Sequence, residues 1–103
     1  MKGLRTWLEV STEALRHNVN IFQRLIGKDT MLMAVVKSNA YGHSLVDAAQ
    51  FFERHGAHWL GVDSVVEGIA LRKAGVKKPI LILGYTLPER LSDVAHLKLT
   101  ASV

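Results

Sequence analysis

The sequence contains no cysteine, and this absence excludes disulfide bridges and thiolate metal sites. It also lacks any apolar run near the roughly 18 residues that a membrane-spanning helix needs. No long apolar segment lies near the N-terminus, so no secretion signal is visible. These absences favour a soluble protein, which we expect in the cytoplasm and without a membrane partner.

The charge of the chain is mildly basic, with 13 Lys and Arg residues against 9 Asp and Glu residues. Most basic residues are scattered, and only the pairs Arg72–Lys73 and Lys77–Lys78 cluster, each beside an expected loop. Nucleic-acid binding favours a basic stripe with interleaved aromatic residues, a pattern that this sequence does not show. We therefore expect no nucleic-acid partner.

The chain has 103 residues, of which 49% are hydrophobic, so one small globular domain with a modest core is expected. Apolar runs without alternation are typical of strands buried on both faces of a parallel sheet. Such runs predict strands over residues 31–36, 59–62 and 80–83. A short strand over 7–10 precedes them, and a last strand begins over 97–103.

In the segments between these strands, apolar residues recur at the spacing of a helix. Ser64 and Glu67 have the spacing of a capping box, which predicts a helix start at this point. The expected helices run from a Ser11 or Thr12 cap to Gly27, from about Leu45 to Gly56, from Ser64 to Gly75, and onward from Pro88.

The resulting order is about three strand–helix units followed by a lone strand. Parallel βα units of this length build barrels or doubly wound sheets, so the fold class is α/β. A barrel needs eight strands, more than this sequence predicts. The chain is therefore either a compact open sheet or part of a longer protein. A barrel fragment would leave its outer strand edges unpaired, a liability in solution.

Lys37 ends an apolar run and begins a turn of small residues. At the end of a buried strand its amine can be partly desolvated, and desolvation lowers the pKa of a lysine and favours attack on a carbonyl. Pyridoxal phosphate is bound to enzymes in this way, as a Schiff base with a lysine. The alternative is a surface lysine in a turn, although catalytic groups of barrels cluster at the C-terminal ends of strands, where Lys37 falls.

The segment Val35–His43, with the sequence VVKSNAYGH, resembles the pyridoxal-phosphate signature of alanine racemases. The similarity continues on both sides of this segment, across essentially the whole chain, and covers about the first third of a typical family member. It is carried by Thr6–Val10, Ala14, Leu15, Asn18 and Val19 before the signature, and by Glu67, Ala70–Arg72, Gly75 and Pro79–Gly84 after it.

The resemblance implies the first part of a (β/α)8 TIM barrel, preceded by a short N-terminal strand and helix. Residues 1–103 would be a partial N-terminal barrel domain of a longer enzyme, with the C-terminal β domain absent. Lys37 matches the Schiff-base lysine, which is also one of two acid/base groups. Tyr41 matches a tyrosine that reaches the cofactor phosphate, and Leu83 matches an apolar residue that lines the cofactor.

The activity that the resemblance implies is the interconversion of L-alanine and D-alanine, which supplies peptidoglycan synthesis, in a homodimer. The family's second acid/base is a tyrosine from the partner's C-terminal domain, and no residue here matches it. We therefore expect the 103 residues alone to be inactive. A broad-specificity amino-acid racemase and a non-catalytic truncated βα module remain as alternatives. The five histidines show no metal-ligand spacing, so no metal site is expected.

Overall fold

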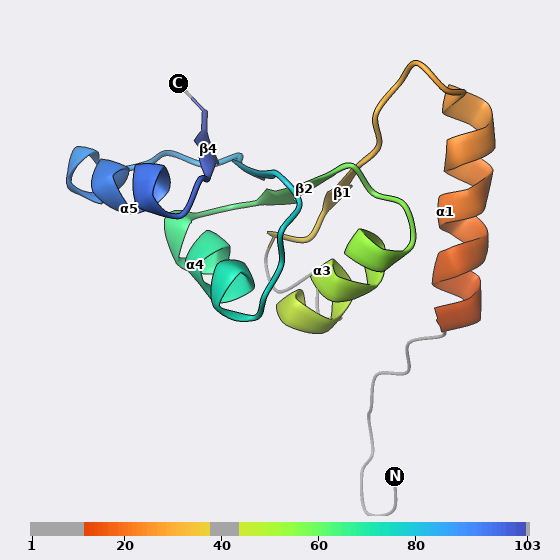
Figure 1. Ribbon diagram of the computed structural model, residues 1–103, viewed down its shortest axis with the longest axis horizontal. Helices are drawn as coiled ribbons and strands as arrows, with labels where there is room; N and C mark the ends of the chain where they lie inside the picture. Colours follow the sequence, from red (N-terminus) through yellow and green to blue (C-terminus); the bar gives the residue numbers. More distant parts are fainter. Residues whose placement is uncertain (1–11, 38–43, 103) are drawn as a thin grey trace, which may run out of the picture.

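The structure is a computed structural model and describes residues 12–37 and 44–102. Four short strands form one parallel sheet in the order β1-β2-β3-β4 (Figure 1). The expected strand over 7–10 lies outside the described residues. The four strands are β1 (Met33–Val35), β2 (Trp59–Val62), β3 (Ile80–Ile82) and β4 (Thr100–Ala101).

The predicted parallel sheet is confirmed, but three strands are shorter than the predicted runs. The runs over 31–36 and 80–83 each form a strand of three residues, and the run over 97–103 forms one of two residues. A strand extends only as far as a neighbour pairs with it. β4 pairs with β3 alone, through Leu81 with Thr100 and Ile82 with Ala101.

The helices begin and end close to the expected positions. The predicted Ser64 cap of α4 forms, whereas Ser11 lies outside the described residues and Thr12 is the first residue of α1. Gly27, directly after the first helix, has φ 75°, and Gly56 has φ 110°, two conformations that favour glycine. Pro88 opens a short 3-10 helix that leads into the last α-helix. The helices are α1 (Thr12–Ile26), α3 (Leu45–Arg54), α4 (Val65–Lys73), η1 (Pro88–Arg90) and α5 (Leu91–His96).

The core lies between the sheet and the helices that cover one of its faces. α3 packs against β2 and α4, and α4 also packs against β3 and α5 (Figure 1). Strand residues that point to this side alternate with residues that point away, as the pleat requires. The fully buried side chains on the helix side include Val36, Leu60, Val62, Leu71, Ile80 and Ile82.

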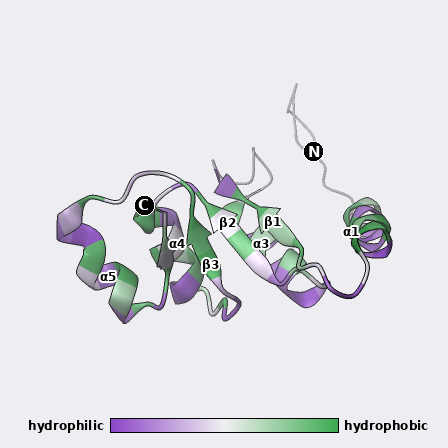
Figure 2. Cartoon of the chain, turned by 90° about the horizontal axis from the view of Figure 1, so that it is seen from above, coloured by the Kyte–Doolittle hydropathy of each residue, from purple (hydrophilic) through white to green (hydrophobic). Residues whose placement is uncertain are grey.

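The opposite face of the sheet is open, so the expected burial on both faces was wrong for this chain. Val35 is 41% exposed and Leu83 is 40% exposed. Hydrophobic residues predominate in the strands (Figure 2). α3 and α4, which contact the strands, lie on the other face, and α1 reaches the β1 edge, where Val19 and Phe22 line a cavity with Val35. Both outer strands also have one edge without a partner strand among the described residues.

α1 lies beyond the β1 edge of the sheet and packs on one side only (Figure 1). Val19 is the buried residue of its apolar face, at 4% exposure, whereas Phe22 on the same face is 55% exposed. Gln23 fixes the helix to the end of α3, because its Nε2 donates to the carbonyl oxygen of Gly56 over 3.1 Å.

Candidate active site

Lys37 lies at the carboxyl edge of the sheet, as the sequence predicts. β1 ends at Val35, the buried Val36 donates its main-chain N–H to the carbonyl oxygen of Gly61 over 2.8 Å, and Lys37 follows. This last hydrogen bond extends the β1–β2 ladder to the residue before the lysine and holds its backbone in place. The Lys37 side chain is partly buried.

An apolar floor lies beside this lysine, made by Val35, Gly61 and Leu83. A Cβ atom on Gly61 would lie 3.3 Å from Cδ1 of Leu83 and 3.4 Å from Cγ2 of Val35. The two side chains therefore converge above the glycine from the strands on either side of β2. Because Gly61 has no side chain, they form one continuous apolar surface.

The sequence predicts Leu83 in this region, and the structure places it at the same edge as Lys37. The sequence analysis does not predict Val35 and Gly61 as parts of the floor. A signal was available for Gly61, because a glycine inside a strand often marks a close approach of neighbouring groups. Tyr41, the other predicted site residue, lies outside the described residues.

Backbone hydrogen bonds tie the carboxyl ends of β2 and β3 together. Leu83 donates to the carbonyl oxygen of Val62 over 2.7 Å, and Gly84 donates to that of Asp63 over 3.0 Å. A Cβ atom at Gly84 would overlap the Asp63 carbonyl oxygen, so only glycine allows this approach. Ser102, directly after β4, joins that strand to the end of β3, since its side-chain hydroxyl donates to the carbonyl oxygen of Ile82 over 2.6 Å.

The N-terminus of α4 begins at the same edge, directly after β2. The Ser64 hydroxyl accepts a hydrogen bond from the Glu67 main-chain N–H over 3.4 Å, and the Glu67 carboxylate accepts one from the Asp63 N–H over 2.6 Å. This is the predicted capping box, except that the carboxylate reaches one residue further back than usual. The cap fixes the turn between β2 and α4.

Two negative findings concern the described residues only. No group of three or more His, Asp or Glu side chains among them is placed to hold a metal ion. None of their helices combines the length and the apolar character that crossing a membrane requires.

The fold and this edge define a parallel βα domain with a partly buried lysine at the carboxyl end of its first sheet strand. A sequence model of the family described as "Alanine racemase, N-terminal domain" matches residues 10–103. The chain therefore belongs to this family.

Individual relatives agree with the family match. The chain is 48% identical to an alanine racemase of Nostoc sp. over 100 residues, and 42% identical to an amino-acid racemase of Enterococcus faecalis over 99 residues. These alignments cover 96% of this chain but only 26% and 14% of the two relatives. The chain thus spans about a quarter or less of the length of these curated relatives.

The solved structures show the same fold. An alanine racemase of Clostridium difficile 630 superposes on this chain with a TM-score of 0.92 at 37% identity. The match covers 100% of this chain and 27% of the racemase chain. The architecture is thus that of the N-terminal part of an alanine racemase barrel, as the sequence predicts.

Proposed function

We propose that these residues belong to a pyridoxal-phosphate enzyme that interconverts L-alanine and D-alanine, with Lys37 as the residue that binds the cofactor covalently. The observation that carries the proposal is the position of Lys37. It is partly buried and lies two residues after the end of β1 at the carboxyl edge of the sheet, where Val35 and Leu83 form an exposed apolar floor. Barrel enzymes place their catalytic groups at this edge.

The described residues fit pyridoxal phosphate by their chemistry. A lysine amine is the group that bonds to the cofactor's aldehyde, and the floor of Val35 and Leu83 offers an apolar surface to a flat aromatic ring. By the family resemblance, Tyr41 would contact the phosphate. When bound, the cofactor withdraws electrons from the substrate and so acidifies the Cα–H bond.

The role of the protein is to move the proton. Lys37 would hold the cofactor through its amine, and the same amine, when free, would act as the base that takes or returns the Cα proton on one face. Racemisation needs a second acid/base on the opposite face. We propose that this group comes from the partner subunit of a cytoplasmic homodimer, that residues 1–103 are the first part of its barrel domain, and that the product D-alanine serves peptidoglycan synthesis.

A second candidate function is racemisation of a wider set of amino acids. It is favoured by the similarity to the relative named an amino-acid racemase, at 42% identity. The two functions share Lys37 and differ in substrate. D-amino-acid formation from a panel of L-amino acids by the full-length enzyme separates them, since a strong preference for alanine supports only the first.

Covalent cofactor binding tests the role of Lys37 without relying on turnover. We expect the full-length protein to develop a visible absorption band with pyridoxal phosphate, and borohydride reduction to fix the cofactor mass on the peptide that contains Lys37. Lys37→Ala should lose both signals. Lys28→Ala removes an exposed lysine after α1 and should keep them. A band that persists in Lys37→Ala would sink the proposal, and absence of any band would favour the non-catalytic alternative.

A further inference from the structure

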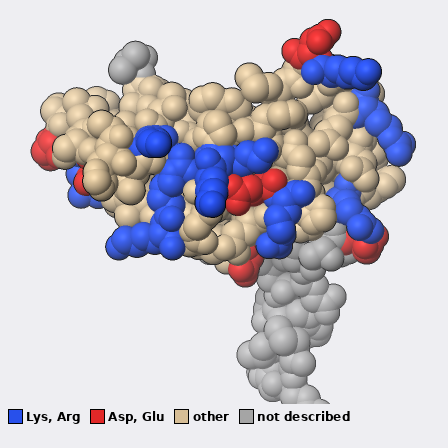
Figure 3. All heavy atoms as spheres, viewed as in Figure 1, with Lys and Arg blue, Asp and Glu red and all other residues tan. Residues whose placement is uncertain are grey.

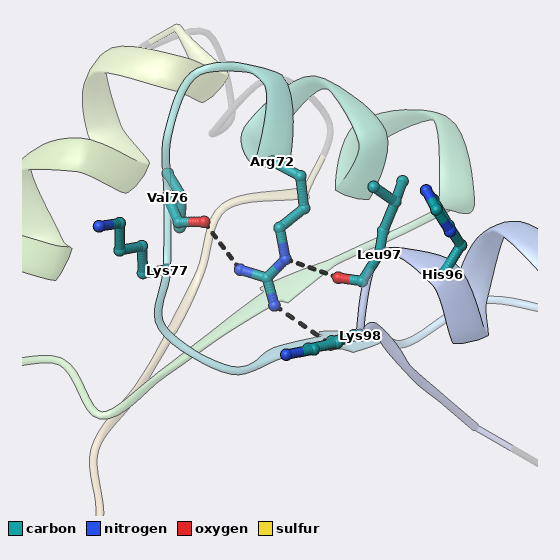
Figure 4. Close-up of a pocket in the computed structure, with 6 residues that line it drawn as sticks. All are labelled: Arg72, Val76, Lys77, His96, Leu97 and Lys98. Carbon is teal, nitrogen blue, oxygen red and sulfur yellow. Dashed lines mark hydrogen bonds between the residues drawn. The ribbon is translucent and has the colours of Figure 1, made fainter.

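A cavity lies at the amino ends of the strands, the end of the sheet opposite to Lys37. Its volume is about 420 Å³, and it lies between the loop that precedes β3 and the loop that precedes β4 (Figure 4). The residues that line it are mostly basic or aliphatic: Arg72, Val76, Lys77, His96, Leu97 and Lys98.

Arg72 joins the two loops that form this cavity. Its guanidinium donates to the carbonyl oxygens of Val76 and Lys78 over 2.9 Å each in one loop, and to those of Leu97 over 2.9 Å and Lys98 over 3.1 Å in the other (Figure 4). These carbonyl oxygens would otherwise repel an anion. Because each is paired with the guanidinium, the cavity presents positive charge instead.

The lysine side chains on both loops remain available. Glu53 accepts hydrogen bonds from the main-chain N–H groups of Lys77 and Lys78, over 2.6 and 2.9 Å, and these contacts do not involve the ammonium groups. Lys77 and Lys98 are exposed, and neither forms a salt bridge with any of the described residues. Figure 4 shows Lys98 below the Arg72 guanidinium and Lys77 beyond Val76, with the Lys77 nitrogen pointing away from the guanidinium.

The charge of this end of the molecule is strongly one-sided. Arg72, Lys77 and Lys98 line the cavity, and Lys78 lies on the same loop as Lys77. Glu53 is a carboxylate that contacts this loop, through the main-chain N–H groups of Lys77 and Lys78. In Figure 3, basic side chains gather around one acidic group in the middle of the face.

We propose that this cavity binds a small polyphosphate, either the free anion or the di- or triphosphate group of a nucleotide. A volume of about 420 Å³ falls in the range of small-molecule sites. Two lysines line the cavity together with a fixed guanidinium, a set of charges that suits an anion with several charged oxygens. Extended nucleic acid is a poorer fit, because His96 is the one ring among the described lining residues on which a base could stack.

The test measures binding of tripolyphosphate to the purified protein by calorimetry at two ionic strengths. The key variant combines Lys77→Gln with Lys98→Asn. It removes two ammonium groups but keeps the main-chain contacts to Arg72 and Glu53, and asparagine tolerates the positive φ of 55° at residue 98. The control combines Arg24→Gln with Lys28→Gln, two exposed cations that do not line the cavity.

We expect saturable binding to the wild type that weakens as salt is raised and weakens about tenfold or more in the cavity variant, since each tenfold is a free-energy change of about 1.4 kcal/mol. The control should bind like the wild type. Binding of inorganic tripolyphosphate and a nucleoside triphosphate with equal strength assigns the site to the phosphates, whereas tighter nucleotide binding assigns it to a nucleotide. The proposal would be overturned if both variants weakened binding equally or if the wild type showed no saturable binding. It would also be overturned if RNA or anionic vesicles bound more tightly than tripolyphosphate.

Discussion

At the scale of single residues, Arg72 connects parts of the chain that are far apart in sequence. Its four hydrogen bonds go to main-chain carbonyl oxygens that lie on either side of η1 and α5. Burial lowers the pKa of Arg72, and the nearby Glu53 carboxylate opposes that shift. An arginine keeps its charge under such conditions, so these are charge-assisted bonds, which are stronger than neutral ones.

Arg72→Gln should therefore destabilise the fold. The shorter amide cannot reach both loops, and partly buried carbonyl oxygens lose their donors, which costs about 2 kcal/mol or more. Urea unfolding followed by circular dichroism measures this loss. Arg24→Gln, on the exposed surface of α1, is the matched control and should leave the unfolding midpoint nearly unchanged. Equal midpoints for the two variants would show that the Arg72 contacts contribute little.

The two key basic residues differ in how far sequence could reveal them. The position of Lys37 near the end of the first sheet strand could be predicted, because an apolar run that ends at a lysine is a local pattern, whereas its proposed role comes from the family resemblance. The role of Arg72 could not, because it depends on which loops come together at the amino ends of the strands. Its partners are main-chain carbonyl groups, which every residue carries, so no pattern of residue types marks them.

At the scale of elements, the start of α4 shapes the edge that holds Lys37 and Leu83. The Ser64 cap satisfies one main-chain N–H of the helix, and Glu67 accepts from Asp63 at the end of β2. The turn after β2 is thus fixed from both sides. Loss of the cap should loosen this turn more than it disturbs the core.

Ser64→Ala should lower the free energy of unfolding by about 1 kcal/mol, the usual value for loss of an N-cap side chain. Thermal unfolding provides the measurement. Ser92→Ala is a suitable control, because Ser92 is exposed in α5 and that helix has no side-chain cap. A Ser64→Ala midpoint no lower than that of Ser92→Ala would mean that the 3.4 Å contact does not stabilise the helix.

The existence and order of the elements could be predicted better than their lengths. Capping and stop signals for the helices are local, and they agree with the structure at Gly27, Gly56 and Ser64. Strand ends depend on the neighbouring strand. β4 pairs with only two of the three residues of β3, and an apolar run in the sequence cannot report how far two strands pair.

At the scale of the whole molecule, the parallel sheet with helices on one face follows from the alternation of strand and helix signals. The open face could not be predicted in the same way, since an apolar strand has the same composition whether or not a second layer covers it. The exposed side chains at this face include Met31 at 66% and Val35 at 41%. Met31, Met33, Trp59, Leu81 and Thr100 line a further cavity of about 330 Å³.

This open face gives a prediction for a chain of these 103 residues studied alone. Exposed apolar surface and unpaired strand edges promote association, so we expect concentration-dependent oligomers in sedimentation experiments and strong binding of a hydrophobic dye. Met31→Lys places a charge on the open face and should reduce both signals. Leu25→Lys is the control, because Leu25 is 76% exposed on α1, away from the sheet. If Leu25→Lys reduced association as much as Met31→Lys, the effect would reflect overall hydrophobicity and not the open face. A monomer that binds no dye at any concentration would contradict the prediction outright.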